Sequence, residues 1–239
     1  MGFWKSRRTR HPFCTAIVAA AGHSSRMGED KLLMDLAGKP VLLRTLRAID
    51  STSLVDEIIV ATRDDLLLPV ADLCKRGCVT KPVKVIRGGE SRTESVLAAA
   101  LEADPRSELL AVHDGARPLI RPEEFDDLVR LGAQTYATVP AVPIHDTVKT
   151  ADEQHRITGT PDRSTLFCVQ TPQVFQTQLL KAALQSALEN GVAVTDDCAA
   201  VERLGKEIYL TDGDPENIKL TTPLDVLVAE AILKRRGQA

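Results

Sequence analysis

The sequence has no large excess of either charge and no long apolar run. Its 239 residues include 30 Lys and Arg against 33 Asp and Glu, which leaves a net charge of -3. Such a balance gives no general attraction to nucleic acid or to membranes, so any anion site must be local. No apolar run approaches the roughly 20 residues that cross a bilayer, and none follows the basic residues near the N-terminus as a signal segment. We therefore expect a cytoplasmic protein.

The chain also lacks any Cys-x-x-Cys pair. Its five cysteines are an odd set without disulfide or zinc spacing, which is typical of a reducing compartment. Cys74 and Cys78 are four residues apart, but Gly77 lies between them and no histidine is near, so free thiols are expected rather than a zinc site. Residues 1–14 are interpreted as a basic, solvated tail to which no function is assigned.

Short apolar runs alternate along the chain with helical patterns. The runs are residues 15–20, 55–62, 82–88 and 108–114. This alternation predicts an α/β fold with a mostly parallel sheet, covered by helices on both faces and joined by right-handed crossovers. With 44% hydrophobic residues, the length suits a single domain over residues 15–239.

Several segments between these runs carry helix signals. Leu42, Leu46 and Ile49 share one helical face, and Ser91 with Glu94 predicts a capping box. The last helix is expected to start at Pro223 after the N-cap Thr222. Its apolar spacing is Leu224, Leu227, Val228 and Ala231.

The alternation breaks between residues 142 and 175. Short extended pieces and a polar turn near 151–153 predict a hairpin with little core of its own, a β-arm over about 142–170. From the pattern alone, an arm that lies on its own domain and one that packs on another subunit are about equally favoured.

Three unusual loops follow predicted strands. They begin after Ala20, after Arg87 and after Val112. Because the carboxyl ends of parallel strands meet at one edge of a sheet, and ligands bind there, these loops predict one shared site.

The opening loop, "AAAGHSSRMGEDK", suits phosphate binding. Gly22 permits close backbone approach, and Arg26 and Lys31 add two cations. An ordinary turn with two solvated cations is about equally favoured for the isolated motif. The dinucleotide pattern G-x-G-x-x-G is absent, because Ser24 and Met27 occupy the later glycine positions, and no Walker A loop is present. Another nucleotide-binding class is therefore required.

The other loops add carboxylate and hydroxyl groups. Asp114 directly follows an apolar strand and can bind Mg²⁺, although an Asx-turn role is equally favoured. His113 is read as a packed, hydrogen-bonded residue and stays unassigned. Lys219 and Arg163 can receive an anionic group, but each one alone is read more readily as surface charge.

Taken together, seven segments resemble the 2-C-methyl-D-erythritol 4-phosphate cytidylyltransferase family of the non-mevalonate isoprenoid pathway. They are "AAAGHSSRM", "RGGESRTESV", "VHDGARP", "VPIHDTVK", "QTPQVF", "TDD" and "ENIKLTTPLD", in that order over residues 15 to about 232. The resemblance implies a Rossmann-like nucleotidyltransferase fold with a projecting β-arm, and a homodimer formed through that arm. The implied reaction converts CTP and methylerythritol phosphate into the CDP-polyol and pyrophosphate, with Mg²⁺ or another divalent cation.

The resemblance also implies roles for individual residues. The catalytic positions are Arg26, Lys31, Arg163 and Lys219, with Arg163 contributed by the partner's arm. The nucleotide-binding positions are Ala20, Ala21, Gly22, Gly89, Glu90, Ser95 and Gly115. The acceptor-binding positions are Thr147, Thr171 and Thr195, and the metal position is Asp114.

Two alternatives stay open at this point. A ribitol 5-phosphate cytidylyltransferase shares the nucleotide loops and differs mainly in the arm, and a catalytically silent nucleotide-binding protein is the rival outside enzymes. For transfer between phosphates no general base is needed, because a phosphate nucleophile is already ionised. Catalysis is then mostly positioning and electrostatic stabilisation.

Overall fold

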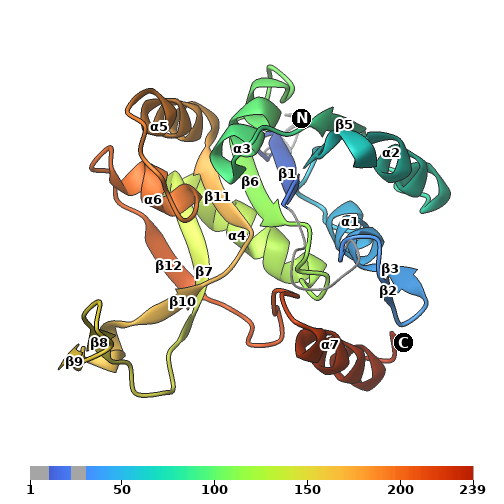
Figure 1. The fold of residues 1–239 in the computed structure, drawn as a ribbon. Coiled ribbons are helices and arrows are strands. Elements are labelled where there is room, and N and C mark those ends of the chain that lie inside the picture. The colour runs from blue at the N-terminus through green and yellow to red at the C-terminus, as the bar shows by residue number, and fades with distance from the viewer. Residues whose placement is uncertain (1–10, 23–30, 239) are drawn as a thin grey trace, which may run out of the picture.

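The computed structural model describes residues 11–22 and 31–238 of the chain. Its centre is a mixed sheet in the order β10-β7-β11-β6-β1-β4-β5, with β12 paired to β7 (Figure 1). The strands are β1 (Cys14–Ala20), β4 (Glu57–Thr62), β5 (Val83–Arg87), β6 (Leu109–Asp114), β7 (Ala137–Pro143), β10 (Phe167–Val169), β11 (Gln173–Gln176) and β12 (Tyr209–Asp212). The first strand thus begins at Cys14, which the sequence analysis assigned to the tail.

Most of the sheet is parallel, as the sequence predicts. β6, β1, β4 and β5 are parallel neighbours, and β12 is parallel to β7. β11 is antiparallel to both β6 and β7, so β7 and β12 have the same direction as the other parallel strands. Only β10 and β11 run the opposite way.

Helices cover both faces of the sheet. Residues of β1 alternate between two cores: Ala16 and Val18 pack under α1, α2 and α4, while Ile17 packs under α3, α5 and α6. These helices are α1 (Val41–Asp50), α2 (Leu67–Arg76), α3 (Arg92–Leu101), α4 (Pro122–Thr135), α5 (Thr177–Glu189) and α6 (Asp197–Glu202). The strands are therefore buried on both sides, which explains why they read as continuous apolar runs.

The predicted face of α1 is confirmed, and the predicted start of α3 is confirmed in part. Leu42, Leu46 and Ile49 are fully buried along α1. Ser91 caps α3 by accepting from the Glu94 amide, but the Glu94 carboxylate accepts from the amide of Glu90 rather than of Ser91, so the predicted capping box is incomplete.

The last helix, α7 (Pro223–Arg235), has the full capping box of Thr222 and Asp225. However, the apolar spacing that predicted it lies on its exposed side, because Leu224 and Leu227 are 66% and 64% exposed. Ala229 and Leu233 are the buried residues instead. They pack in a third core against the short hairpin β2 (Asp35–Leu36) and β3 (Lys39–Pro40).

The predicted arm is a hairpin that projects from the body, at the lower left of Figure 1. It contains β8 (Thr150–Ala151), β9 (Ile157–Gly159) and a short 3₁₀ turn at Arg163–Thr165. Another such turn, Asp64–Leu66, precedes α2. Nearly all arm side chains between β7 and β10 are exposed or only partly buried, so the arm has no core of its own. Within the described ranges, no helix is long and apolar enough to cross a membrane.

Candidate functional site

Four loops meet at one edge of the sheet, because β1, β5, β6 and β12 all end there. Ala21 and Gly22 follow β1, and the Gly88–Ser91 loop follows β5. Asp114 ends β6, and the chain after β12 leads through Asp214 to Lys219. The sheet topology therefore confirms the prediction that the loops after Ala20, Arg87 and Val112 lie at a common edge, and it adds the segment after β12 to them.

These loops enclose a first cavity of about 230 Å³. Most of the nucleotide and catalytic positions implied by the resemblance line it. They are Ala20, Ala21, Gly22, Lys31, Gly89, Glu90, Ser95 and Lys219, and the metal position Asp114 lines the cavity as well.

The Gly88–Ser91 loop can hold its shape only with glycine at two positions. A Cβ on Gly88 would stand 2.7 Å from Ser95 Oγ and 2.8 Å from the Ala21 Cβ. A Cβ on Gly89 would stand 2.3 Å from the Glu94 Cβ. Ser95 Oγ accepts from the Gly89 amide at 3.1 Å and donates to the Ser91 carbonyl at 2.8 Å. The Ser95 hydroxyl thus fixes the loop that lines the cavity.

A second cavity of about 240 Å³ adjoins the first one. Two predicted acceptor positions, Thr171 and Thr195, line it together with Arg117. Both cavities include Arg92, Asp114 and Lys219, which we call the shared wall. Two ligands, one in each cavity, would meet at this wall.

Asp114 is the electrostatic centre of the shared wall. Its carboxylate lies 2.9 Å from Lys219 Nζ, 3.4 Å from Arg117 Nε and 3.7 Å from Arg92 Nη2. Burial disfavours the charged form, but the cations, Lys219 foremost, outweigh it and lower the pKa of Asp114 to about 2. Three cations thus surround Asp114, and two of them, Arg92 and Lys219, belong to the shared wall, which suits an anionic ligand.

Arg92 and Arg117 are site residues that the sequence reasoning missed. Arg92 Nη1 lies 2.8 Å from the buried carboxylate of Asp197, whose pKa is raised by burial although Arg92 opposes that shift. Arg117 Nη1 donates to the Asn217 carbonyl at 2.7 Å. Arg92 lies in the segment RGGESRTESV and Arg117 in the segment VHDGARP, so these segments were the signal that could have pointed to the two arginines. Their carbonyl and carboxylate partners are about 100 positions away.

His113 supports the site from beneath, as the packed-histidine reading predicts. It is fully buried and its Nε2 bonds to the Arg117 carbonyl at 3.1 Å. A carbonyl can only accept, so Nε2 carries the proton and Nδ1 accepts from the Thr171 hydroxyl at 3.0 Å. Thr171 Oγ1 in turn accepts from the Asp114 amide at 3.0 Å. The Thr171 hydroxyl is thus committed to holding the backbone at Asp114.

Four of the implied site residues are not among those lining the cavities. Gly115 lies behind the first cavity, with its amide bonded to the Ala19 carbonyl and its carbonyl accepting from Thr45, while Ala116 lines the cavity. Thr147 and Arg163 are exposed on the arm and line neither cavity of their own chain. Arg26 lies outside the described residues, as do Ser24 and Met27 of the same loop.

A larger cavity, of about 650 Å³, lies between α1 and the end of α7. Its lining is basic, but the cations there are largely in use. Arg44 donates to the carbonyls of Leu36, Ala37 and Gln238, and Arg47 donates to that of Gly77. These arginines join backbone segments, so we place the functional site at the shared wall.

Comparison with known proteins identifies the family of the chain. The model of the 2-C-methyl-D-erythritol 4-phosphate cytidylyltransferase family matches residues 14–235. Two curated proteins of that name are similar: one from Parasynechococcus marenigrum is 43% identical, covering 93% of this chain and 98% of the relative. One from Caldanaerobacter subterraneus is 40% identical, covering 92% and 99%.

Solved structures agree as well. The 4-diphosphocytidyl-2C-methyl-D-erythritol synthase of Anaerococcus prevotii superposes with a TM-score of 0.85 at 30% identity, over 95% of this chain and all of that one. The cytidylyltransferase of Thermus thermophilus gives 0.75 at 27% identity, over 92% and 98%. The chain belongs to the 2-C-methyl-D-erythritol 4-phosphate cytidylyltransferase family, which transfers a cytidylyl group from CTP to that polyol phosphate in isoprenoid precursor biosynthesis.

Proposed function

We propose that the first cavity holds CTP and the second holds the polyol phosphate, so that the two react at the shared wall. The observation that carries this proposal is that Arg92, Asp114 and Lys219 line both cavities. The first cavity is built from glycine-rich loops that can approach a triphosphate and a base closely. The second cavity adds Arg117 and Thr195, which suit an anionic, hydroxylated acceptor.

In this arrangement the residues catalyse by charge and position. The acceptor phosphate and the α-phosphate of CTP are both anionic and must approach in line, so cations are needed where they meet. Lys31 stands in the first cavity and Lys219 at the wall, and Arg26 belongs to the same opening loop. His113 stays neutral and hydrogen-bonded away from the cavities, in keeping with a reaction that needs no general base.

We propose Mg²⁺ as the metal, held by Asp114. Among the described residues, no group of three or more His, Cys, Asp or Glu side chains could hold a metal by itself. The single carboxylate of Asp114 fits Mg²⁺ at a triphosphate, because Mg²⁺ there commonly takes one or two carboxylates and completes its shell with phosphate oxygens and water. When bound, the ion offsets charge on the reacting phosphates.

We propose further that the protein works as a homodimer in the cytoplasm. Four large apolar side chains of β10 and β12 are about half exposed, namely Phe167, Val169, Tyr209 and Leu210. A second copy can bury these side chains together with the exposed Ile157 of the arm. The five cysteines are all free thiols, which suits a reducing compartment.

The test of the activity is release of pyrophosphate from CTP and Mg²⁺ with each of two acceptors. 2-C-methyl-D-erythritol 4-phosphate is expected to support turnover, and ribitol 5-phosphate to support far less. A preference for ribitol 5-phosphate would reassign the acceptor cavity. Absence of pyrophosphate with both acceptors, while CTP still binds, would indicate a silent nucleotide-binding protein.

A further inference from the structure

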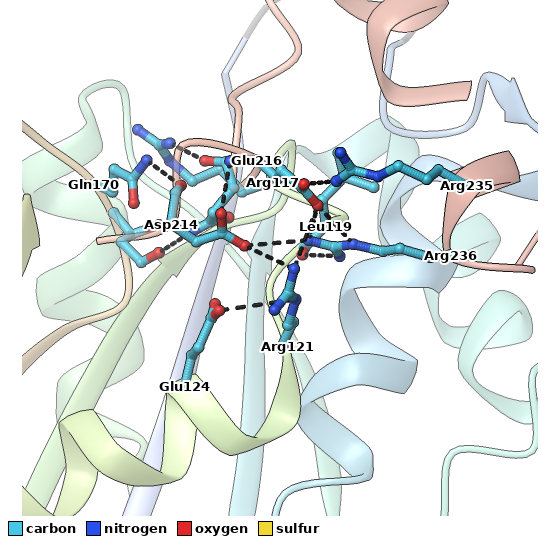
Figure 2. Close-up of polar contacts among 11 residues, drawn as sticks. Arg117, Leu119, Arg121, Glu124, Gln170, Asp214, Glu216, Arg235 and Arg236 are labelled. Carbon is cyan, nitrogen blue, oxygen red and sulfur yellow. Dashed lines mark hydrogen bonds and ion pairs between the residues drawn. The ribbon is translucent and has the colours of Figure 1, made fainter. Parts of the chain in front are cut away.

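The C-terminal end of α7 reaches the loops after β6 and β12, which are next to Asp114 and Lys219 of the shared wall (Figure 2). Arg236 directly follows the helix, and its side chain is only 13% exposed. Its Nε donates to Glu216 at 2.9 Å, its Nη2 to Asp214 at 3.2 Å and its Nη1 to the Leu119 carbonyl at 2.8 Å. One guanidinium therefore joins the loop after β6 to the loop after β12.

Arg121 strengthens the same junction from the start of α4. Its Nη2 lies 3.5 Å from Asp214 and 3.4 Å from Glu216. Arg235 is more exposed and contacts Glu216 alone. Asp214 and Glu216 thus stand close together with arginines around them, and Arg236 is the one whose planar fork engages both carboxylates and a carbonyl at once.

The loop held in this way continues directly to Lys219. Asn217 is fixed next, since its carbonyl accepts from Arg117 and its Nδ2 donates to the Thr171 carbonyl at 2.9 Å. Lys219 then reaches Asp114, and the Leu220 amide donates to the Ala116 carbonyl at 2.9 Å. Arg236 therefore holds the start of the loop, and the contacts of Lys219 with Asp114 and of Leu220 with Ala116 hold its end.

We infer that Arg236 is a positioning residue that holds the Asp214–Lys219 loop so that Lys219 stands at the shared wall. The inference rests on the catalytic role proposed above for Lys219. Without Arg236, the carboxylates of Asp214 and Glu216 are left with the more exposed Arg121 as their joint partner and repel each other more strongly, and the start of the loop is freed from Leu119. A displacement of about 1 Å at a reacting phosphate is enough to lower turnover strongly.

A double-mutant cycle tests this inference. Arg236→Ala is expected to lower kcat roughly tenfold, with a smaller change in the KM for CTP. In a Lys219→Ala background the same substitution is expected to change kcat less than about twofold, because a residue that acts through Lys219 has nothing left to position. Arg236→Lys is expected to fall in between, since one ammonium cannot serve three acceptors at once.

Arg235→Ala is the matched control, because it removes a neighbouring arginine that reaches Glu216 but not Asp214 or Leu119. Its kcat is expected within about twofold of wild type. If Lys219→Ala has normal kcat, the proposed role of Lys219 is wrong and the inference with it. If Lys219→Ala is slow but Arg236→Ala slows it by a further tenfold, the inference alone is wrong. Should Arg236→Ala fail to fold, the cycle is run with Arg236→Lys, for which a wild-type kcat overturns the inference.

Discussion

His113 shows how a single buried residue can shape the site without touching a ligand. Burial lowers its pKa to about 4, although its bonds to Arg117 and Thr171 partly offset that shift. The neutral ring can accept from Thr171 while donating to Arg117, and it thereby orients the backbone at Asp114. A charged ring would have to donate from both nitrogens, which would disrupt this chain of hydrogen bonds.

The lowered pKa of His113 predicts a pH dependence of stability. Between about pH 6.5 and pH 4, the unfolded chain binds a proton that the folded chain does not, so the free energy of unfolding falls as pH falls through this range. The loss from this group is on the order of 3 kcal/mol. In urea titrations, His113→Gln is expected to be less stable at pH 7 and to lose less stability on acidification. The exposed His145→Gln serves as control, and an equal slope in all three proteins would contradict the assignment.

Lys31 is expected to act mainly on the transition state, because it lines the cavity proposed to hold the reacting triphosphate. Lys31→Ala should lower kcat by roughly 10²-fold, or about 2.7 kcal/mol. Arg26→Ala in the same loop should have a similar effect. Lys39→Ala, in the hairpin away from both cavities, is the control in steady-state pyrophosphate assays. Near-normal turnover of the Lys31 and Arg26 variants would refute their assignment.

Asp114 is expected to set the metal requirement. Asp114→Asn removes the charge that can hold Mg²⁺ while leaving a side chain of the same size beside Lys219 and Arg92. The Mg²⁺ concentration at half-maximal activity should therefore rise, by roughly fivefold or more. The measurement is a Mg²⁺ titration of pyrophosphate release at saturating CTP. A midpoint equal to that of the wild type would count against the metal role.

At the level of elements, α7 shows that the signals for forming a helix differ from those that decide which face of it packs. The capping box and the apolar spacing correctly predict a helix, but the spacing does not identify the face that packs. Leu233→Ala should cost about 2 to 4 kcal/mol in unfolding free energy because it empties the third core. Leu227→Ala, on the exposed face, should change stability by less than about 0.5 kcal/mol. Similar losses in both variants would show that the exposed face is buried in solution, for example against a second copy.

The difference between local signals and long-range contacts explains what the sequence could and could not predict. Strand ends and glycine loops are local signals, so the common edge followed from them, whereas Ala20, Ala21, Gly89, Glu90 and Ser95 of the first cavity were assigned by the family resemblance. Pairs such as Arg92 with Asp197 depend on contacts between segments far apart in the chain, and apart from the motif that contains it, nothing near Arg92 distinguishes it from a surface arginine. Gly115 was assigned to the nucleotide by resemblance, yet its backbone is bonded within the core.

At the level of the whole molecule, the arm carries two implied site residues that lie outside both cavities of their own chain. Arg163 is exposed, and its Nη1 donates to the nearby His145 carbonyl at 2.8 Å. Neither cavity of the same chain includes Arg163 or Thr147. A role in the acceptor site thus requires the arm to reach another subunit, as the family resemblance implies.

Mixed dimers can test this arrangement in trans. Arg163→Ala and Lys31→Ala homodimers should each be nearly inactive, because every site lacks one cation. After subunit exchange, a mixed dimer would contain one site with intact Lys31 from the first chain and intact Arg163 from the second. Its other site would lack both. Activity should return to at most about half of the wild-type value per mixed dimer, since one of two sites is complete.

The opposite arrangement gives a different result for a simple geometric reason. If Arg163 served its own subunit, each site would draw both cations from one chain, and every chain in the mixture lacks one of them. Mixing would then restore no activity, however complete the exchange. Native mass spectrometry of the mixture supplies the fraction of mixed dimers. If the recovered activity scales with that fraction, it supports a role of Arg163 in the acceptor site of the partner subunit. Verified exchange without recovered activity rules that role out.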